Sequence, residues 1–393
     1  MSLSKRRIAV FTGNRAEYGL QFSVLHAIAN NPRLEYSLLV SGSHLKEESG
    51  QTLKEIKADG FDVHSQITID MPGESLFSVA HSIGSGVVNI SRVLDELRPD
   101  VLVVYGDRSE SFAALIASTQ MGIPTAHIEG GDYTEGGALD DSVRHAMTKL
   151  AHLHFTTNQQ AFERVLGLGE EPWRVFNVGL PGLDLIAAGQ FAPADEVYER
   201  LDLDPKFPIL VFTQHSIATE FHQAAAQVNP SLLALEEAGR EWGCQTIITY
   251  PNDDAGGKAI MEGEKHLAAK GLSFIRLRPS LGRRLYHGVL NVASACVGNS
   301  SSGIKETPAF ACSAVNIGDR QSGRLAAGNV LHVGYDKDQI KNAIRRSLFD
   351  EEFKEVVRTC ENPYSKGGAG SSIAETLATI ELSQRLIQKK MTY

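Results

Sequence analysis

The stretch DVLVVY at residues 100–105 decides the fold class of this chain. After its first residue it is a continuous apolar run, rich in valine, and it stops at Gly106-Asp107-Arg108. Such runs are typical of strands in parallel sheets, which helices cover on both faces. Similar runs recur along the chain, between segments with the apolar spacing of helices. We expect further strands at residues 7–12, 35–40, 124–128, 209–213, 246–250, 274–277, 290–297 and 314–317.

The expected strands form two sets, and a proline-rich segment separates them. We therefore predict two Rossmann-like, doubly wound α/β lobes that face a central cleft. The N-terminal lobe spans 1–178, the connection 179–207 and the C-terminal lobe 208–370. Helices are expected at residues 18–30, 231–242 (entered just after Pro230), 256–270 and 371–389. The last helix, within about 371–393, is expected to pack back on the N-terminal lobe.

Composition argues against several classes of protein. The 393 residues carry 38 Lys and Arg against 47 Asp and Glu, a net charge of −9, which disfavours nucleic-acid and anionic-membrane partners. The four cysteines stand far apart without metal-ligand spacing, as expected for thiols in a reducing compartment. We find no signal-peptide pattern and no apolar run of about 18 residues. We therefore expect a cytoplasmic protein.

The turn GNSSSG at residues 298–303 is the first candidate binding site. It follows an expected strand and precedes a helix expected to begin near Ile304, so its backbone N–H groups and hydroxyls can face an anion. We interpret it as a phosphate site rather than a plain capped turn, although it lacks the P-loop motif of ATPases. Glu306 is a candidate acceptor for two ribose hydroxyls, but a carboxylate near a helix N-terminus is also favourable by itself.

Three residues suited to a diphosphate follow expected strands in both lobes. They are Arg15, His215 and Arg320. Arginine offers a rigid fork that matches phosphate oxygens, and histidine can donate a hydrogen bond or a proton. A single residue of this kind is usually an ordinary surface group. Three of them at strand ends favour the functional interpretation.

The N-terminal lobe gathers carboxylates where its strands end. Asp107 and Glu129 each follow an expected strand, and Asp140 and Asp141 open the next expected helix. Arg144 lies one turn later on the face that both aspartates share. The aspartate pair also fits simple helix capping. In a cleft, however, close like charges raise the pKa of one member, which supplies a general acid beside a general base.

Two patterns are similar to metal sites but are incomplete. The acidic stretch NDD at residues 252–254 lacks the Asp-x-Asp spacing of some glycosyltransferases, and HLH at residues 152–154 has no third ligand nearby. We expect no metal at either place.

Taken together, the strand-end motifs resemble those of the hydrolysing UDP-N-acetylglucosamine 2-epimerases of sialic-acid and related nonulosonate biosynthesis. The resemblance covers nearly the whole chain. The matching stretches are TGNRAEYG at 12–19, GSHL at 42–45, GDR at 106–108, HIEGG at 127–131, DDSVRHAMTKL at 140–150, QH at 214–215, GNSSSG at 298–303 and IGDRQ at 317–321. The non-hydrolysing branch typically has RPE in the first of these loops and HVEAG in the fourth, so this chain is more similar to the hydrolysing branch.

The resemblance implies a GT-B-like fold, a UDP-sugar substrate, a homodimer or homotetramer, and neither a metal nor a redox cofactor. It also implies roles for individual residues. The UDP-binding residues would be Arg15, Arg108, His215, Asn252, Asn299, Ser300, Ser301, Glu306 and Arg320. The sugar-binding residues would be Ser43, His44 and His145. The catalytic residues would be Asp107, Glu129, Asp141, Arg144 and His215. Which carboxylate removes a proton and which returns it stays open.

Three departures from the family pattern leave the sugar and the details open. Asp132 stands where the family often has Glu, and Ser216 stands where Pro often follows the histidine. The loop YTEGGA at residues 133–138 is longer than in the animal and meningococcal-type enzymes. It is more similar to members that act on UDP-2,4-diacetamido-2,4,6-trideoxyglucose in the legionaminic-acid pathway.

Other functions remain as alternatives. A GT-B glycosyltransferase, a non-hydrolysing epimerase and a non-catalytic nucleotide-sugar sensor would share the UDP site.

Overall fold

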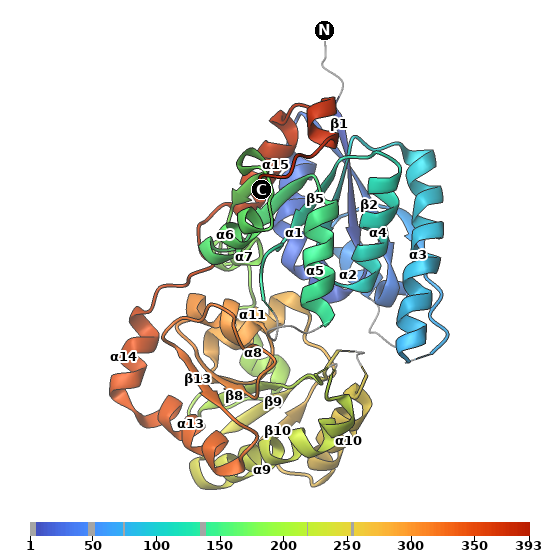
Figure 1. Ribbon diagram of the computed structural model, residues 1–393. Coiled ribbons are helices and arrows are strands. Elements are labelled where there is room, and N and C mark those ends of the chain that lie inside the picture. Colours follow the sequence, from blue (N-terminus) through green and yellow to red (C-terminus); the bar gives the residue numbers. More distant parts are fainter. Residues whose placement is uncertain (1–4, 46–51, 74, 134–138, 218, 253–254) are drawn as a thin grey trace. The chain divides into compact units, whose positions relative to one another are not determined.

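The computed structural model describes residues 5–45, 52–73, 75–133, 139–217, 219–252 and 255–393 (Figure 1). Contacts divide the chain into two compact units. The first comprises Met1–Asp132, Leu139–Asp184 and Tyr364–Tyr393, and the second comprises Tyr133–Ala138 and Leu185–Pro363. Each unit has its own parallel sheet with helices between the strands, which confirms the predicted pair of doubly wound α/β lobes.

The first unit contains a seven-stranded sheet in the order β3-β2-β1-β4-β5-β6-β7, with every neighbouring pair parallel. Its strand order reverses between β1 and β4, the position where such sheets bind ligands. The strands are β1 (Arg6–Thr12), β2 (Leu34–Ser41), β3 (Val63–Ile67), β4 (Val101–Tyr105), β5 (Thr125–Ile128), β6 (Leu153–Thr156) and β7 (Val175–Asn177). The helices are α1 (Arg15–Asn30), η1 (Gly42–Leu45), α2 (Thr52–Ala58), α3 (Leu76–Leu97), α4 (Ser109–Gln120), α5 (Leu139–Leu150), α6 (Gln159–Gly167), η3 (Pro172–Arg174), α7 (Gly182–Ala187), α15 (Ala369–Thr379) and α16 (Gln384–Ile387).

The second unit contains a six-stranded parallel sheet in the order β10-β9-β8-β11-β12-β13, and its order reverses between β8 and β11. The strands are β8 (Ile209–Thr213), β9 (Gln245–Ile248), β10 (Ile275–Leu277), β11 (Ala295–Gly298), β12 (Ser313–Ile317) and β13 (Val330–Val333). The helices are α8 (Ala194–Leu201), η4 (Phe221–Gln223), α9 (Ala224–Trp242), α10 (Gly257–Ala269), α11 (Gly282–Val292), α12 (Ser302–Lys305), η5 (Thr307–Phe310), α13 (Lys337–Phe349) and α14 (Glu351–Thr359).

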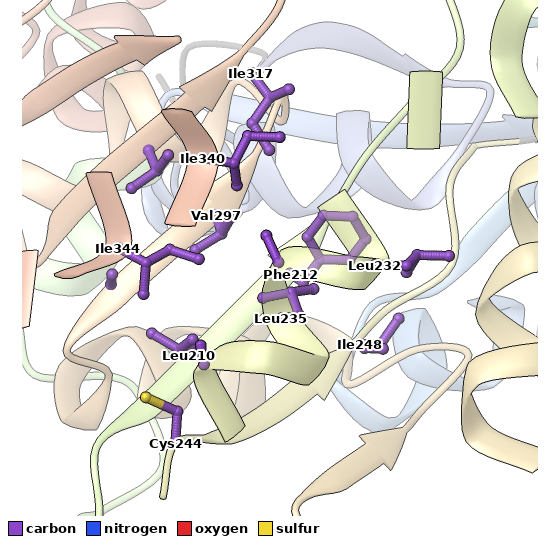
Figure 2. Close-up of a cluster of buried hydrophobic side chains, with 14 of the residues drawn as sticks. Leu210, Phe212, Leu232, Leu235, Cys244, Ile248, Val297, Ile317, Ile340 and Ile344 are labelled. Atoms are coloured by element: carbon purple, nitrogen blue, oxygen red, sulfur yellow. The ribbon is translucent and has the colours of Figure 1, made fainter. Parts of the chain in front are cut away.

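The second sheet is buried on both faces. In β8, Leu210 and Phe212 enter one apolar cluster, while Ile209 and Val211 enter another. Figure 2 shows the first cluster, in which Phe212 lies among side chains from neighbouring strands and helices. Burying such a side chain contributes about 1.5–3 kcal/mol, so a strand covered on both sides favours an uninterrupted apolar run.

The C-terminal segment belongs to the first unit, where α15 packs on α1 (Figure 1). A Cβ on Gly370 would lie 2.6 Å from the backbone oxygen of Ser23, so only glycine allows this close approach. The Asp184 carboxylate accepts hydrogen bonds from the N–H groups of Ala369 (3.0 Å) and Gly370 (2.7 Å). These bonds fix the start of α15. The proposed lobe boundaries at residues 178, 207 and 370 stay a prediction.

The predicted long helix at 371–389 is wrong, because α15 ends at Thr379 and only the short α16 follows. The backbone leaves the helical region at Ile380 (φ −56°, ψ 136°), and buried Arg174 binds the short α16 beyond it. Its guanidinium donates to the backbone oxygens of Arg385 (2.5 Å) and Leu386 (2.7 Å), and these contacts hold the chain end against the first unit.

Two other expected elements also differ. The predicted strand at 290–297 spans the last turn of α11 and β11, because an apolar run of this length does not distinguish a buried helix from a strand. The helix expected from residue 231 begins instead at Ala224 and contains Pro230. Val228 and Leu232 are buried on either side of this proline, and their burial offsets the lost backbone hydrogen bond.

Within the described ranges, no helix combines the length and the apolar content needed to cross a bilayer.

Candidate functional site

In the first unit, the loops after β1 and β2 are tied together at the carboxyl edge of the sheet. The Thr12 hydroxyl lies 3.0 Å from Nε2 of buried His44, one of the predicted sugar-binding residues. Asn14 caps α1 by accepting a hydrogen bond from the Glu17 N–H (3.0 Å). The predicted Arg15 is the first residue of α1, and the predicted Ser43 lies in η1.

Asp107 and Arg144 form a largely buried ion pair in the same unit. Asp107 follows β4, and Arg144 reaches it from α5 with its side chain only 2% exposed. A buried arginine holds a carboxylate in a fixed orientation, which a proton-transfer group requires. Arg108, the next residue, is half-buried and stands at the N-cap of α4.

Glu129 combines burial with an uncommon backbone conformation. It is 6% exposed, follows β5 and has a φ of 69°, in the left-handed region that non-glycine residues seldom adopt. Such a conformation costs about 1–3 kcal/mol and is found most often at functional sites. Gly131 follows with a φ of 77°, and a Cβ there would lie 2.4 Å from the backbone oxygen of Ala161. This packing keeps the Glu129 turn in place.

His127 joins the two strand ends that carry Asp107 and Glu129. Its Nε2 lies 2.7 Å from the backbone oxygen of Gly106, which directly precedes Asp107. Complete burial lowers the pKa of His127 to about 4, so the ring is neutral at pH 7 and Nε2–H is the donor. His127 stands in the HIEGG motif, but its role could not be predicted, because the contact joins residues 21 positions apart.

The helix α5 begins as predicted, with Asp140 and Asp141 in its first turn. Asp141 is 3% exposed. His145 is half-buried one turn later, where desolvation lowers its pKa despite the opposing charge of Asp141. Thus Asp107, Glu129 and Asp141 all lie in segments that follow neighbouring strands of one sheet.

Glu17, a carboxylate of this unit that was given no role in the predicted site, has a raised pKa. Burial first, and then the charge of Glu110, raise the pKa of Glu17 to about 7. Glu17 stands within the TGNRAEYG motif, and its proximity to Glu110 comes from the tertiary fold rather than from sequence spacing.

In the second unit, Asn299 connects the loops on the two sides of the strand-order reversal. Its Oδ1 accepts a hydrogen bond from the His215 N–H (2.6 Å), and its Nδ2 donates to the His215 backbone oxygen (2.9 Å). Its own backbone oxygen accepts bonds from Arg320 (3.1 Å) and Gln321 (2.8 Å). The structure therefore brings together His215, Asn299 and Arg320, with the Asn299 side chain completely buried.

Gly298 permits this arrangement. Its φ is 127°, and a Cβ there would lie 2.0 Å from the Thr213 backbone oxygen. The predicted Ser300 and Ser301 follow and are half-buried. The next helix, α12, begins at Ser302 rather than near Ile304.

His215 has a defined tautomer. Its Nδ1 accepts a hydrogen bond from the Asn252 N–H (3.1 Å), so the proton of the neutral ring lies on Nε2. The Asn252 side chain itself is exposed.

Glu306 is buried and hydrogen-bonded, and it lies just after α12 rather than in its first turns. Its carboxylate accepts from the Ser302 hydroxyl (2.5 Å) and lies 3.5 Å from Nε2 of His287. Burial opposes ionisation, but the bonds from His287 and Ser302 outweigh it and lower the pKa of Glu306. An ionised, fixed carboxylate suits a pair of ribose hydroxyls. His287 was not predicted, because α11 brings it to Glu306 from 19 residues earlier.

The histidines of the incomplete HLH pattern form hydrogen bonds within the first unit. His152 accepts a hydrogen bond from the Thr125 N–H (3.1 Å), and the ring of His154 bonds the Glu170 carboxylate (3.0 Å). Of the NDD stretch, Asp253 and Asp254 lie outside the described residues.

Comparison with known proteins identifies the family. The profile of the UDP-N-acetylglucosamine 2-epimerases matches residues 26–378. The chain belongs to the UDP-N-acetylglucosamine 2-epimerase family. A UDP-N,N'-diacetylbacillosamine 2-epimerase (hydrolyzing) of Legionella pneumophila is 32% identical to it over 99% of this chain and 100% of the relative. A UDP-N-acetylglucosamine 2-epimerase of Neisseria meningitidis is 33% identical over 87% of each chain.

Solved structures of this family have the same fold. The crystal structure of UDP-GlcNAc 2-epimerase from Neisseria meningitidis bound to UDP-GlcNAc superposes with a TM-score of 0.81 at 17% identity, over 95% of this chain and 99% of that one. The enzyme of Methanocaldococcus jannaschii, in complex with UDP-GlcNAc and UDP, gives a TM-score of 0.78 at 16% identity over 94% and 99%. The predicted GT-B-like two-lobe fold is thereby confirmed.

Proposed function

We propose that this family member is a hydrolysing 2-epimerase, which converts a UDP-N-acetylglucosamine-type sugar into UDP and the free manno-configured N-acetyl sugar. The observation that carries the proposal is the bond between His127 and Gly106, which joins the two adjacent strand ends that are followed by half-buried Asp107 and buried Glu129. Fixed carboxylates at neighbouring positions can serve as base and acid. Relatives of about one-third identity include two named as hydrolyzing, which supports the hydrolysing branch.

The second unit would hold the nucleotide. Ser300 and Ser301 would bind phosphate, and Glu306 would accept the ribose hydroxyls. His215 Nε2–H and Arg320 would take up the negative charge of the diphosphate as it leaves. Their positions are preorganised, since both residues bond Asn299.

Residues of the first unit complete the proposal. Arg15 and Arg108 would add positive charge at the diphosphate. Ser43, His44 and His145 would contact the sugar, and Arg144 would orient Asp107 through the observed ion pair.

The reaction would proceed by elimination and hydration. A carboxylate removes the C2 proton as the C1–O bond breaks and the electron pair leaves with UDP, which gives a 2-acetamidoglycal. Water then adds its oxygen to C1 and gives up one proton to a carboxylate, while a carboxylic acid returns a proton to the opposite face of C2. Asp107, Glu129 and Asp141 are the candidates for both roles. Removal of the C2 proton is the most difficult step to catalyse, because that C–H bond is only weakly acidic until UDP departs.

Two sugars fit the proposal. UDP-N-acetylglucosamine is the first, and the free product would be N-acetylmannosamine for sialic-acid synthesis. UDP-N,N'-diacetylbacillosamine, which is UDP-2,4-diacetamido-2,4,6-trideoxyglucose, is the alternative, and the product would enter legionaminic-acid synthesis. The Legionella pneumophila relative, whose whole length this chain matches, supports the second sugar.

The test is incubation of each UDP-sugar with the protein in D₂O, without an acceptor, followed by NMR. The proposal expects free manno sugar with deuterium at C2, and the better of the two substrates identifies the sugar. A returned UDP-sugar epimer would indicate the non-hydrolysing reaction. Turnover only with an added acceptor, and no deuterium at C2, would indicate a glycosyltransferase. Binding without release of UDP would indicate a sensor.

A further inference from the structure

Glu17 lies at the point where two strand-end loops of the first unit meet. It is 4% exposed. Its Oε2 accepts a hydrogen bond from the Gly13 N–H at 2.8 Å, and its Oε1 accepts one from the Ser111 hydroxyl at 3.1 Å. Gly13 directly follows β1, and Ser111 lies in the first turn of α4. One carboxylate therefore joins the segments that follow β1 and β4, the strands on either side of the strand-order reversal.

The loops around Glu17 are packed without spare room. A Cβ on Gly13 would lie 2.9 Å from the Cβ of Glu110, in the first turn of α4. A Cβ on Gly42, after β2, would lie 2.3 Å from the Gly13 backbone oxygen. Movement of the Gly13 loop would therefore be transmitted to the other two loops. Asp107 and Arg108 stand immediately before α4, so their backbone is part of this assembly.

We propose that Glu17 is a positioning residue, whose carboxylate fixes the Gly13 loop against the start of α4 and so orients Asp107 and Arg108. This inference rests on the proposed function, because it takes Asp107 and Arg108 to be part of the active site. The contacts themselves are independent of that assumption.

The ionised form of Glu17 is the one that makes both bonds. A carboxylate offers acceptors to Gly13 and to Ser111 at once, whereas a protonated carboxyl must place its own hydrogen on one oxygen. Burial and the nearby Glu110 raise the pKa of Glu17 to about 7, against the opposing effects of the Gly13 bond, the Arg108 charge and the Ser111 bond. In the described part of the loop after β2, residues 42–45, the titratable side chain is that of His44, which contacts Thr12. The orientation of the α4 start is therefore expected to change with pH near neutrality.

The test variant is Glu17→Gln, which resembles the protonated residue. Its amide oxygen can still accept from the Gly13 N–H, but its NH₂ group cannot accept from the Ser111 hydroxyl, so one of the two bonds is lost. Glutamine has the same size and shape as glutamate, so folding should be retained. The matched control is Glu264→Gln. Glu264 is a completely buried carboxyl of the second unit, on α10, and burial raises its pKa to about 8. This control removes a comparable titrating group from the second unit, outside the loops around Glu17.

Two measurements on the full chain decide between the outcomes. The first follows the Gly13 amide by ¹H–¹⁵N NMR over a pH titration. We expect it to shift with a midpoint near pH 7 in the wild type and the control, and to stay constant in Glu17→Gln. The second is the pH dependence of kcat/KM. We expect kcat/KM of the wild type and of the control to fall as pH drops below about 7. For Glu17→Gln we expect no such fall at acid pH. Above pH 7 we expect kcat/KM of Glu17→Gln to be lower than that of the wild type by about tenfold or more, since small displacements of catalytic groups have effects of this size.

Each outcome bears on a different statement. The role of Glu17 would be overturned if the chemical shift of the Gly13 amide did not change with pH, or if kcat/KM of Glu17→Gln still fell below about pH 7. Either result would leave the 2-epimerase proposal intact. A titrating Gly13 amide in a protein that turns over neither UDP-sugar would support the bridge and overturn the proposed function. If the control Glu264→Gln also lacked the fall of kcat/KM below about pH 7, this fall would not be specific to Glu17, and the inference would be overturned.

Discussion

Replacement of Glu264 by Gln is expected to stabilise the second unit at neutral and alkaline pH. Glu264 lies on the buried face of α10, between Ile260 and Leu267 of the apolar cluster shown in Figure 2. Among the described residues, neither of its carboxylate oxygens has a hydrogen-bond partner. Burial therefore raises its pKa from 4.5 to about 8. The native protein keeps this carboxyl protonated at a pH at which the unfolded chain would ionise it.

The magnitude follows from proton linkage. A group with a raised pKa in the folded state contributes stability that is complete below its unfolded pKa of 4.5 and is lost as pH rises to about 8. Each unit of pKa difference corresponds to about 1.36 kcal/mol, so the loss reaches about 4–5 kcal/mol once both states are ionised. Glutamine has the same shape and does not ionise. We expect the variant to exceed the wild type by about 3–4 kcal/mol near pH 7.5 and by less than about 1 kcal/mol near pH 5.

The two tryptophans allow the second unit to be observed separately. Trp242 ends α9, which packs on α10, whereas Trp173 lies in the first unit. In a Trp173→Phe background, urea unfolding followed by fluorescence reports on Trp242. The free energies of unfolding of Glu264→Gln and the parent are then compared at both pH values. A difference that is independent of pH, or a variant that is less stable near pH 7.5, would refute the reasoning.

Three further outcomes are expected. Asp107→Asn, Glu129→Gln and Asp141→Asn should each reduce turnover at least about a hundredfold, measured as UDP release, and near-wild-type rates for all three would end the acid–base assignment. Asn299→Ala removes the acceptor for the buried His215 N–H, which costs about 1–3 kcal/mol, so calorimetry should show UDP affinity about tenfold lower or worse; unchanged affinity would contradict this loop-holding role. Activity should survive EDTA, because the resemblance places leaving-group stabilisation on cationic side chains; inactivation by EDTA with full recovery on Mg²⁺ would count against it.

Strands with continuous apolar runs were predictable, and those with mixed patterns were not. β8 and β4 are buried along their whole length, so their sequences directly show their environment. β3 and β13 lie at sheet edges and are only partly buried, so polar residues interrupt their patterns and they were missed. The short edge strand β7 was missed as well, although β10, which is equally short, was predicted.

For the candidate site, the sequence indicated which residues follow strands but not which contacts hold them. Asp107, Glu129 and His215 were selected because strand ends of a parallel sheet meet at one edge. The roles of His127, His287 and Glu17 depend on neighbours brought in by strand order and helix packing. No periodic pattern encodes such contacts, although all three are titratable residues of low exposure in the folded protein.

The return of residues 364–393 to the first unit has a consequence for biosynthesis. A chain emerging from the ribosome exposes the whole of the second unit before it exposes α15 and the backbone carbonyls that Arg174 engages. Synthesis of the first unit therefore starts before that of the second unit and is completed after it. Until residues 364–393 have been synthesised, the surface of α1 that receives α15 is open to chaperones. A nascent polypeptide truncated before residue 364 would carry a complete second unit and an incomplete first unit.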